Sequence, residues 1–306
     1  MRIWRSLDEI PQDLGSTTVV IGNFDGVHLG HQHVVQRGRE LADTQGTRLV
    51  AVTFDPHPMA VLRPEHAPQQ LSSIERRCEL LADAGVDDVF VIPFSREIAG
   101  WTPEEFIERV LVEGLHCVGV VVGANFRFGS RAAGDVNTLN AHGGFVVDGV
   151  ALDGGPQVWS STYVRTCLAA GDVEGAAEAL GRPYAVMGPV TRGDQRGREL
   201  GYPTANVALN GQAAPADGVY AGWLRRLDTD ERFPAAISVG TNPTFEGERE
   251  RRVEAYVLDQ TGLDLYDVIV EVTFVAHLRG MIRFDGIDAL LAAMADDVER
   301  TRALLA

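Results

Sequence analysis

TTVVIGNFDGVHLGH, residues 17–31, is the stretch that decides the fold of the first half of this chain. Its first six residues form an apolar, β-branched run that predicts a buried strand. A turn rich in Gly and His follows, and then a helical pattern with apolar positions at Val34, Val35, Gly38, Leu41 and Ala42. In a turn of this kind, backbone N–H groups and the positive end of the helix dipole face an incoming phosphate.

The same alternation of strand and helix continues beyond this turn. Val-rich runs predict strands at 49–54, 88–92 and 117–122, and helical patterns lie at 74–84 and 103–112. Such a pattern predicts a parallel sheet covered by helices on both faces. Ligands bind such sheets beyond the carboxyl ends of the strands, and unusual residues follow Gly22, Phe54 and Val122.

A different pattern begins after two short helices predicted at 162–169 and 173–180. Gly181 and Pro183 end the helical pattern, so we place a boundary there between two domains, 1–182 and 183–306. The second domain carries short strands with turn signals between them, at 185–192, 218–227, 235–239, 252–258 and 268–275. This spacing predicts a small antiparallel barrel. A terminal helix follows, with an apolar stripe of Ile287, Leu290, Leu291, Met294 and Val298.

Composition limits the classes of function. The chain has 306 residues, enough for two cores, and its formal net charge of −16 argues against a nucleic-acid binder. The charged N-terminus, with Arg2, Arg5, Asp8 and Glu9, does not resemble a secretory signal peptide. No stretch approaches the roughly 18 to 20 apolar residues that span a bilayer. We therefore expect a cytoplasmic protein without a membrane or nucleic-acid partner; its oligomeric state stays open, a weak homo-oligomer included.

The three cysteines, Cys78, Cys117 and Cys167, are widely scattered. This spacing suits neither a disulfide framework nor a zinc site. We expect buried thiols in a reducing compartment.

The pattern His-x-Gly-His places His28 and His31 three residues apart, where both can reach one phosphate chain. Their imidazoles could donate hydrogen bonds to charge that develops on an α-phosphate during adenylyl transfer. Gly26 and Gly30 allow a close approach of the backbone. The alternative is a Gly-rich turn with two exposed histidines.

Three further segments of the first domain have features of a ligand site. In TFDPHP, residues 53–58, two prolines stiffen a loop that carries Asp55 and His57, although a merely rigid loop is the alternative. In GANFRFG, residues 123–129, an amide and aromatic rings suit a base or flavin edge, although the phenylalanines fit a core equally well. In SSTYVR, residues 160–165, a hydroxyl can cap a helix, and Arg165 can clamp pyrophosphate.

These segments carry a resemblance to a known family. HxGH resembles the motif of the nucleotidyltransferase superfamily, and GNFDGVHLGH, TFDPHP, GANFRFG and SSTYVR resemble, in order, segments of the prokaryotic bifunctional riboflavin kinase/FAD synthetase family. In the second domain PTAN, SVGTNPTFEG, RVEAYVLD and FVAHLRGMIRF are similar to segments of the same family. The resemblance implies a Rossmann-like nucleotidyltransferase domain followed by a riboflavin kinase barrel. It also implies the substrates ATP, riboflavin and FMN, with Mg²⁺ as cofactor.

The resemblance assigns roles to residues in the first domain. His28 and His31 are implied to be catalytic. The residues implied to bind ATP are Gly22, Phe24, Asp25, Gly26, His28, Gly30, His31, Asn125, Ser161, Thr162 and Arg165. Those implied to bind FMN are Asp55, His57, Pro58, Phe126 and Arg127.

The second domain has a glycine-rich segment, residues 188–206, that lacks the spacing of a Walker P-loop. Its four glycines suit a flexible loop around phosphates. The residues that the resemblance places at ATP are Gly188, Arg192, Gly193, Arg196, Gly197, Thr204 and Asn206. Of these, Thr204 and Asn206 offer hard oxygen ligands to Mg²⁺.

A kinase also needs a carboxylate near the attacking hydroxyl. In strand 252–258, Val253, Ala255 and Val257 share one face and Glu254 points to the other. The catalytic Glu of the family falls on Glu254, whose alternative is a solvated strand carboxylate. The remaining residues implied to bind flavin are Phe274, Leu278 and Arg279, the last near the phosphates or the isoalloxazine.

Three rival interpretations stay open. One domain has lost its activity, or the chain is a flavin-binding or regulatory protein on the same scaffold. In the third, the substrate of adenylylation is not FMN.

Overall fold

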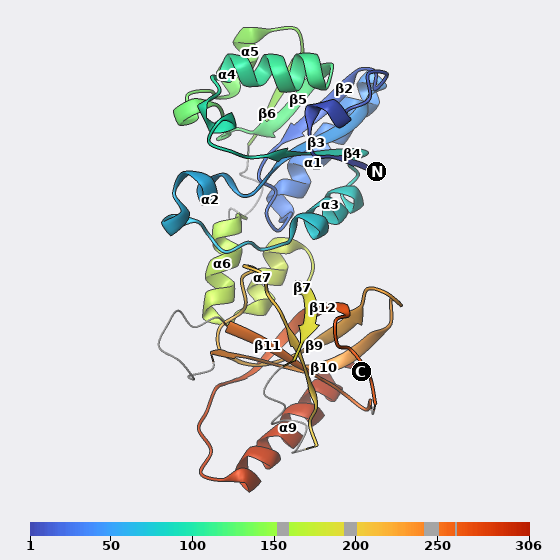
Figure 1. Cartoon of the computed structure of the whole chain (residues 1–306), viewed down its shortest axis with the longest axis vertical. Helices are drawn as coiled ribbons and strands as arrows, with labels where there is room; N and C mark the ends of the chain where they lie inside the picture. The colour runs from blue at the N-terminus through green and yellow to red at the C-terminus, as the bar shows by residue number, and fades with distance from the viewer. Residues whose placement is uncertain (152–158, 193–200, 242–250, 261) are drawn as a thin grey trace. The chain divides into compact units, whose positions relative to one another are not determined.

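The structure is a computed structural model that describes residues 1–151, 159–192, 201–241, 251–260 and 262–306. The chain divides into two compact units (Figure 1). The first contains Met1–Pro68 and Ile74–Trp159, and the second contains Gln69–Ser73 and Ser160–Ala306. The boundary that the sequence predicts at residue 182 stays a prediction of where the functional domains divide.

The first unit is built around a six-stranded sheet with strand order β1-β4-β3-β2-β5-β6. Every paired strand in it runs parallel to its neighbour, as the sequence predicts. The strands are β1 (Arg2–Trp4), β2 (Thr17–Ile21), β3 (Arg48–Asp55), β4 (Asp88–Pro93), β5 (Cys117–Gly123) and β6 (Val146–Val150). Strand β2 lies between β3 and β5 in this sheet and is buried along its whole length.

Helices connect these strands (Figure 1). They are α1 (Leu29–Gln45), α2 (Pro58–Leu62), α3 (Ile74–Asp83), α4 (Pro103–Phe106) and α5 (Val136–His142). Single helical turns lie at Leu7–Glu9, Pro64–His66, Ile98–Gly100 and Ser130–Ala132. The helix predicted at 103–112 begins as expected, but from Ile107 to Gly114 it continues as a π-helix.

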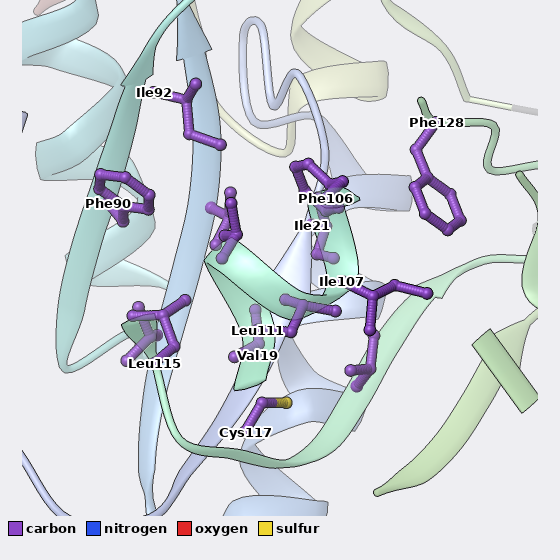
Figure 2. Packing of buried hydrophobic residues seen from close by; sticks show 14 of the residues in the cluster. Val19, Ile21, Phe90, Ile92, Phe106, Ile107, Leu111, Leu115, Cys117 and Phe128 are labelled. Atoms are coloured by element: carbon purple, nitrogen blue, oxygen red, sulfur yellow. The ribbon is translucent and has the colours of Figure 1, made fainter. Parts of the chain in front are cut away.

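Alternate residues of the central strands supply two separate cores. Val19 and Ile21 of β2 pack with Phe90, Ile107 and Leu111 on one face of the sheet (Figure 2). On the other face, a second cluster contains Val20, Leu49, Val35 and Ala42, the last two from α1. The apolar positions that predict α1 therefore hold it against the sheet and fix where its N-terminus lies relative to β2.

The second unit contains a closed antiparallel barrel with strand order β10-β11-β8-β7-β12-β9, which confirms the predicted barrel. Its strands are β7 (Tyr184–Thr191), β8 (Thr204–Val207), β9 (Gly218–Arg226), β10 (Arg232–Thr241), β11 (Arg251–Val257) and β12 (Ile269–Gly280). The sequence analysis did not predict β8 as a strand.

Three helices of the second unit are α6 (Ser161–Ala170), α7 (Val173–Leu180) and the terminal α9 (Ile287–Leu305). Helices α6 and α7 group with the barrel rather than with the parallel sheet. The terminal helix forms as predicted, but its buried residues are Asp297 and Thr301 rather than the apolar stripe.

The three cysteines are free and buried, as expected. Across the residues that the structure describes, no helix has both the length and the apolar composition needed to cross a membrane.

Candidate functional site

The loop between β2 and α1 holds its backbone in a tightly folded conformation. The Gly22 N–H donates to the Val52 carbonyl at 3.1 Å, and the Val27 N–H donates to Phe24 O at 3.0 Å. Phe24, Gly26 and Val27 all have positive φ angles, of 48°, 79° and 39°. Non-glycine residues rarely adopt this region and do so mostly at functional sites. The surrounding residues must therefore hold the loop in this unfavourable backbone conformation.

His28 and His31 come together at the N-terminus of α1. Their rings stack with centroids 3.7 Å apart and an interplanar angle of 24°. Nδ1 of His28 accepts the His31 backbone N–H at 3.3 Å, so His28 caps the helix. Only 5% of His28 is exposed, which excludes the alternative of two exposed histidines. A methyl group on Gly30 would lie 3.1 Å from the His28 ring, so glycine is what allows this packing.

The environment of His31 keeps its imidazole neutral. Burial is the largest influence on its pKa, followed by His28 and Arg77, and together they hold the pKa well below the ordinary 6.5. Among the described residues, nothing donates to or accepts from the buried Nδ1 of His31. A neutral imidazole still has one N–H to donate.

A buried ion pair lies below this loop. Asp25 and Arg77 have side chains only 3% and 2% exposed, with Nη2 and Oδ1 3.6 Å apart. Nη1 of Arg77 also donates to the Phe54 carbonyl at 3.1 Å, so the pair ties the loop to the end of β3. The sequence analysis missed Arg77, although it lies three residues after Ile74 on the apolar face of α3.

The TFDPHP segment ends β3 and starts α2. Nδ1 of His57 accepts the Met59 backbone N–H at 3.1 Å and caps α2, whose first residue is Pro58. Asp55, the last residue of β3, pairs with Pro93 of β4 and is half-buried. The contacts of Asp55, His57 and Pro58 with FMN stay predictions.

In the GANFRFG segment, Phe128 is a core residue, 6% exposed. Phe126 stacks on it with ring centroids 5.5 Å apart and is partly buried. Arg127 forms an ion pair with Asp135 at 2.9 Å, and Asn125 is exposed. The flavin and nucleotide contacts of Asn125, Phe126 and Arg127 stay predictions.

The SSTYVR segment belongs to the second compact unit. The Ser160 hydroxyl accepts the Tyr163 N–H at 3.1 Å, which is the predicted capping role. Ser161 and Thr162 lie in the first turn of α6, and Nε of Arg165 donates to the Gln69 carbonyl at 2.8 Å. The roles of Ser161, Thr162 and Arg165 at ATP stay predictions.

In the barrel, three of the predicted residues meet on one face. Glu254 lies opposite Asn206 of β8 and Ser238 of β10 in the strand register. The Thr204 hydroxyl donates to Oε2 of Glu254 at 3.3 Å. Val253 and Ala255 are buried, so the predicted alternation of β11 is confirmed.

Two pockets adjoin at Thr204. The larger, about 460 Å³, is lined by Thr204 and Asn206 and extends to Tyr266. The smaller, about 200 Å³, lies on the side of Thr204 where Glu254 is, and α9 forms part of its wall. The guanidinium of Arg192 lies 5.5 Å from the ring centroid of Tyr266, at the border of the larger pocket.

Three residues that the resemblance places at the kinase substrates lie in strands of the barrel. Gly188 belongs to β7 rather than to a flexible loop, and a Cβ there would collide with the Ala208 carbonyl. Phe274 is fully buried and packs edge-on against Tyr220, and its contact with flavin stays a prediction. Leu278 is 7% exposed and packs with Val219 and Ala221.

Arg279 lines the smaller pocket, but its guanidinium pairs with Asp297 at 2.7 Å. Its predicted place near the phosphates or the isoalloxazine stays a prediction. Gly193, Arg196 and Gly197 lie outside the described residues.

Two side chains that line the larger pocket carry oxygen atoms of the kind that a magnesium ion prefers. In the described part of the chain, no group of three or more His, Cys, Asp or Glu side chains could hold a metal. Mg²⁺ takes oxygen ligands, retains water, and needs only about one or two protein ligands beside phosphate oxygens. The hydroxyl of Thr204 and the amide oxygen of Asn206 can supply these two.

Comparison with known proteins extends over both units. A family model described as FAD synthetase matches residues 10–157, and one described as riboflavin kinase matches residues 180–305. A bifunctional riboflavin kinase/FMN adenylyltransferase of Pseudomonas fluorescens is 38% identical, over 100% of this chain and 98% of that protein. The chain belongs to the bifunctional riboflavin kinase/FMN adenylyltransferase family.

A second curated protein and a solved structure are also similar to this chain over nearly its whole length. The Escherichia coli K12 protein of the same name is 35% identical, over 95% of this chain and 93% of that protein. A crystal structure from Streptococcus pneumoniae, described as a macrolide-efflux protein, is 30% identical with a TM-score of 0.86 and covers 98% of both chains. The relatives therefore share both the parallel-sheet unit and the barrel unit.

Proposed function

We propose that this chain phosphorylates riboflavin to FMN with ATP, and then adenylylates FMN to FAD with release of pyrophosphate. The observation that carries the proposal is the match of two family models, one to the residues of each unit. Full-length relatives that bear both activities in their name support it.

The first reaction fits the paired pockets of the barrel. Riboflavin occupies the smaller, largely apolar pocket, and the phosphates of ATP occupy the larger one, which meets it at Thr204. Glu254 accepts the proton of the 5′-hydroxyl as that oxygen bonds to the γ-phosphorus, while the bond to the bridging oxygen of ADP breaks. Thr204 and Asn206 would hold Mg²⁺, which would neutralise charge on the phosphates when bound.

The second reaction fits the loop between β2 and α1. A phosphate oxygen of FMN bonds to the α-phosphorus of a second ATP, and the bond to pyrophosphate breaks. The neutral His31 and its partner His28 donate hydrogen bonds to charge that develops on the α-phosphate. The positive end of α1 favours the same charge.

Neither reaction requires a covalent enzyme intermediate. The substrates are the small molecules ATP, riboflavin and FMN, so the proposal includes no membrane and no nucleic acid. The proposal also includes a cytoplasmic location, where ATP is available.

The proposal is tested by incubating the purified protein with riboflavin, ATP and Mg²⁺ and separating the flavins by chromatography over time. FMN that appears first and then gives way to FAD is the expected result. FMN alone would limit the activity to the barrel unit. Bound flavin without conversion would make the chain a flavin-binding protein.

A further inference from the structure

The terminal helix α9 does not bury its apolar stripe. Within α9, all of whose residues are described, the buried side chains are the polar Asp297 and Thr301. Leu290, Met294 and Val298 are only partly buried and line the smaller pocket. Because an amphipathic helix normally packs its apolar stripe against protein, a stripe that faces a pocket is suited to cover an apolar ligand.

A carboxylate–guanidinium pair holds this helix against the barrel. Nε of Arg279, on β12, donates to Oδ1 and Oδ2 of Asp297 at 3.0 and 3.1 Å, and Nη2 donates to Oδ2 at 2.7 Å. The side chains are 21% and 5% exposed, so the pair is well shielded from water. Charged, two-pronged hydrogen bonds of this kind fix orientation as well as distance.

This pair borders the same pocket as Glu254. Glu254, Arg279 and Asp297 all line the smaller pocket, so two carboxylates face one ligand space. The carboxylate of Asp297 is held by the guanidinium, whereas Glu254 accepts from the Thr204 hydroxyl. The guanidinium of Arg279 holds the carboxylate of Asp297 in place through these hydrogen bonds.

We propose that Asp297 and Arg279 are positioning residues of the kinase site. Their pair fixes α9 as the outer wall of the flavin pocket, so that the ring system of riboflavin is held with its hydroxyl near Glu254. Neither residue exchanges a proton or contacts the phosphorus. This inference rests on the proposed kinase function of the barrel.

The test compares Asp297→Asn and Arg279→Lys with the parent chain in steady-state assays of FMN formation. If α9 is no longer held in place, riboflavin binding should weaken more than the phosphoryl-transfer step slows. We expect KM for riboflavin to rise about tenfold or more, with kcat within about threefold. FMN-to-FAD conversion by the same preparations should stay unchanged, which controls for protein quality.

Arg302→Ala is the matched control. Arg302 is on the same helix and pairs with Asp259 at 2.8 Å, but this pair is at the surface, with side chains 43% and 67% exposed. Exposed pairs contribute little, so KM and kcat should stay at parental values.

Three results would overturn the inference: an unchanged KM in both pocket variants, an equal rise in KM in Arg302→Ala, or a fall in kcat at constant KM. If Asp297→Asn unfolds the barrel, Arg279→Lys decides, because it retains the charge. Quenching of riboflavin fluorescence must then show weaker binding than in the parent. A parent chain that forms no FMN would instead refute the proposed function.

Discussion

The imidazole rings of His28 and His31 stack 3.7 Å apart at the start of α1, and His28 accepts the backbone N–H of His31. His28 thus caps the helix, and the surroundings of His31 lower the pKa of its imidazole. The three-residue spacing creates this contact because residues i and i+3 lie in the same helical turn.

Acid should destabilise the first unit through His31. Burial, His28 and Arg77 keep the folded-state pKa of His31 well below 6.5, whereas the unfolded chain has the ordinary pKa. The unfolded state therefore binds the proton first, and stability is retained above pH 6.5 and lost as pH falls toward the folded-state pKa, by about 1.4 kcal/mol for each unit of difference.

The measurement is urea unfolding at pH 7.5 and 5.0, for the parent and for His31→Gln. The variant should lose less stability between the two pH values. Equal losses would show that His31 is not held neutral. The hydrogen bond to Glu108 raises the pKa of His142, which therefore contributes the opposite dependence of stability on pH. Both proteins retain His142, so its contribution cancels when they are compared.

Removal of the buried guanidinium should damage the first unit selectively. Arg77→Met leaves Asp25 without the partner that lies 3.6 Å away, which costs about 3–5 kcal/mol when a buried pair is broken. The double variant Asp25→Asn/Arg77→Met should recover part of this loss. Unfolding monitored in urea, together with assays of both activities, should show FMN-to-FAD conversion falling while FMN formation persists. A loss below about 1 kcal/mol would contradict the pairing.

Strand and helix patterns predicted most of the architecture, because apolar periodicity reports burial directly. It reported the alternation of β11 correctly and so placed Glu254 on the outer face. The same alternation places Phe274 on the face of the buried Val270 and Val272, whereas the resemblance implies a flavin contact, which stays a prediction.

Other features depend on contacts that no local pattern contains. The apolar stripe of α9 has the same sequence pattern whether the helix packs on a core or borders a ligand pocket. Arg77 and Asp25, or Arg279 and Asp297, belong to separate elements, and only the folded chain brings each pair together. The four-residue strand β8 is too short for its alternation to stand out beside the glycines before it.

The barrel should not tolerate a methyl group at Gly188. The added Cβ would meet the backbone carbonyl of Ala208, which cannot move without disturbing the strand pair. We expect Gly188→Ala to lower stability by about 1–3 kcal/mol. Gly240→Ala is the control, since the nearest atom to its Cβ is at 3.6 Å. Thermal unfolding of the two variants is the measurement. Equal melting temperatures would contradict the expected collision between the added Cβ and the Ala208 carbonyl.

For FMN formation, the hydroxyl group of Thr204 should matter more than the shape of the Thr204 side chain. Thr204→Val removes both the hydrogen bond to Glu254 and one oxygen proposed to bind Mg²⁺. We expect kcat/KM for FMN formation to fall about 100-fold, and Thr204→Ser to retain most of the activity. Assays at several Mg²⁺ concentrations test this, and full activity of Thr204→Val would remove Thr204 from the site.

The most direct test of two separate sites in one chain is Glu254→Gln, supplied in parallel reactions with riboflavin or with FMN, each with ATP and Mg²⁺. Glu254 lies in the barrel unit, on the pocket that adjoins the proposed ATP pocket. With riboflavin, FMN formation should fall by about 100-fold or more, because the carboxylate no longer accepts the hydroxyl proton. With FMN, the rate of FAD formation should equal that of the parent. Loss of both activities in a protein that remains folded would contradict the two-site assignment.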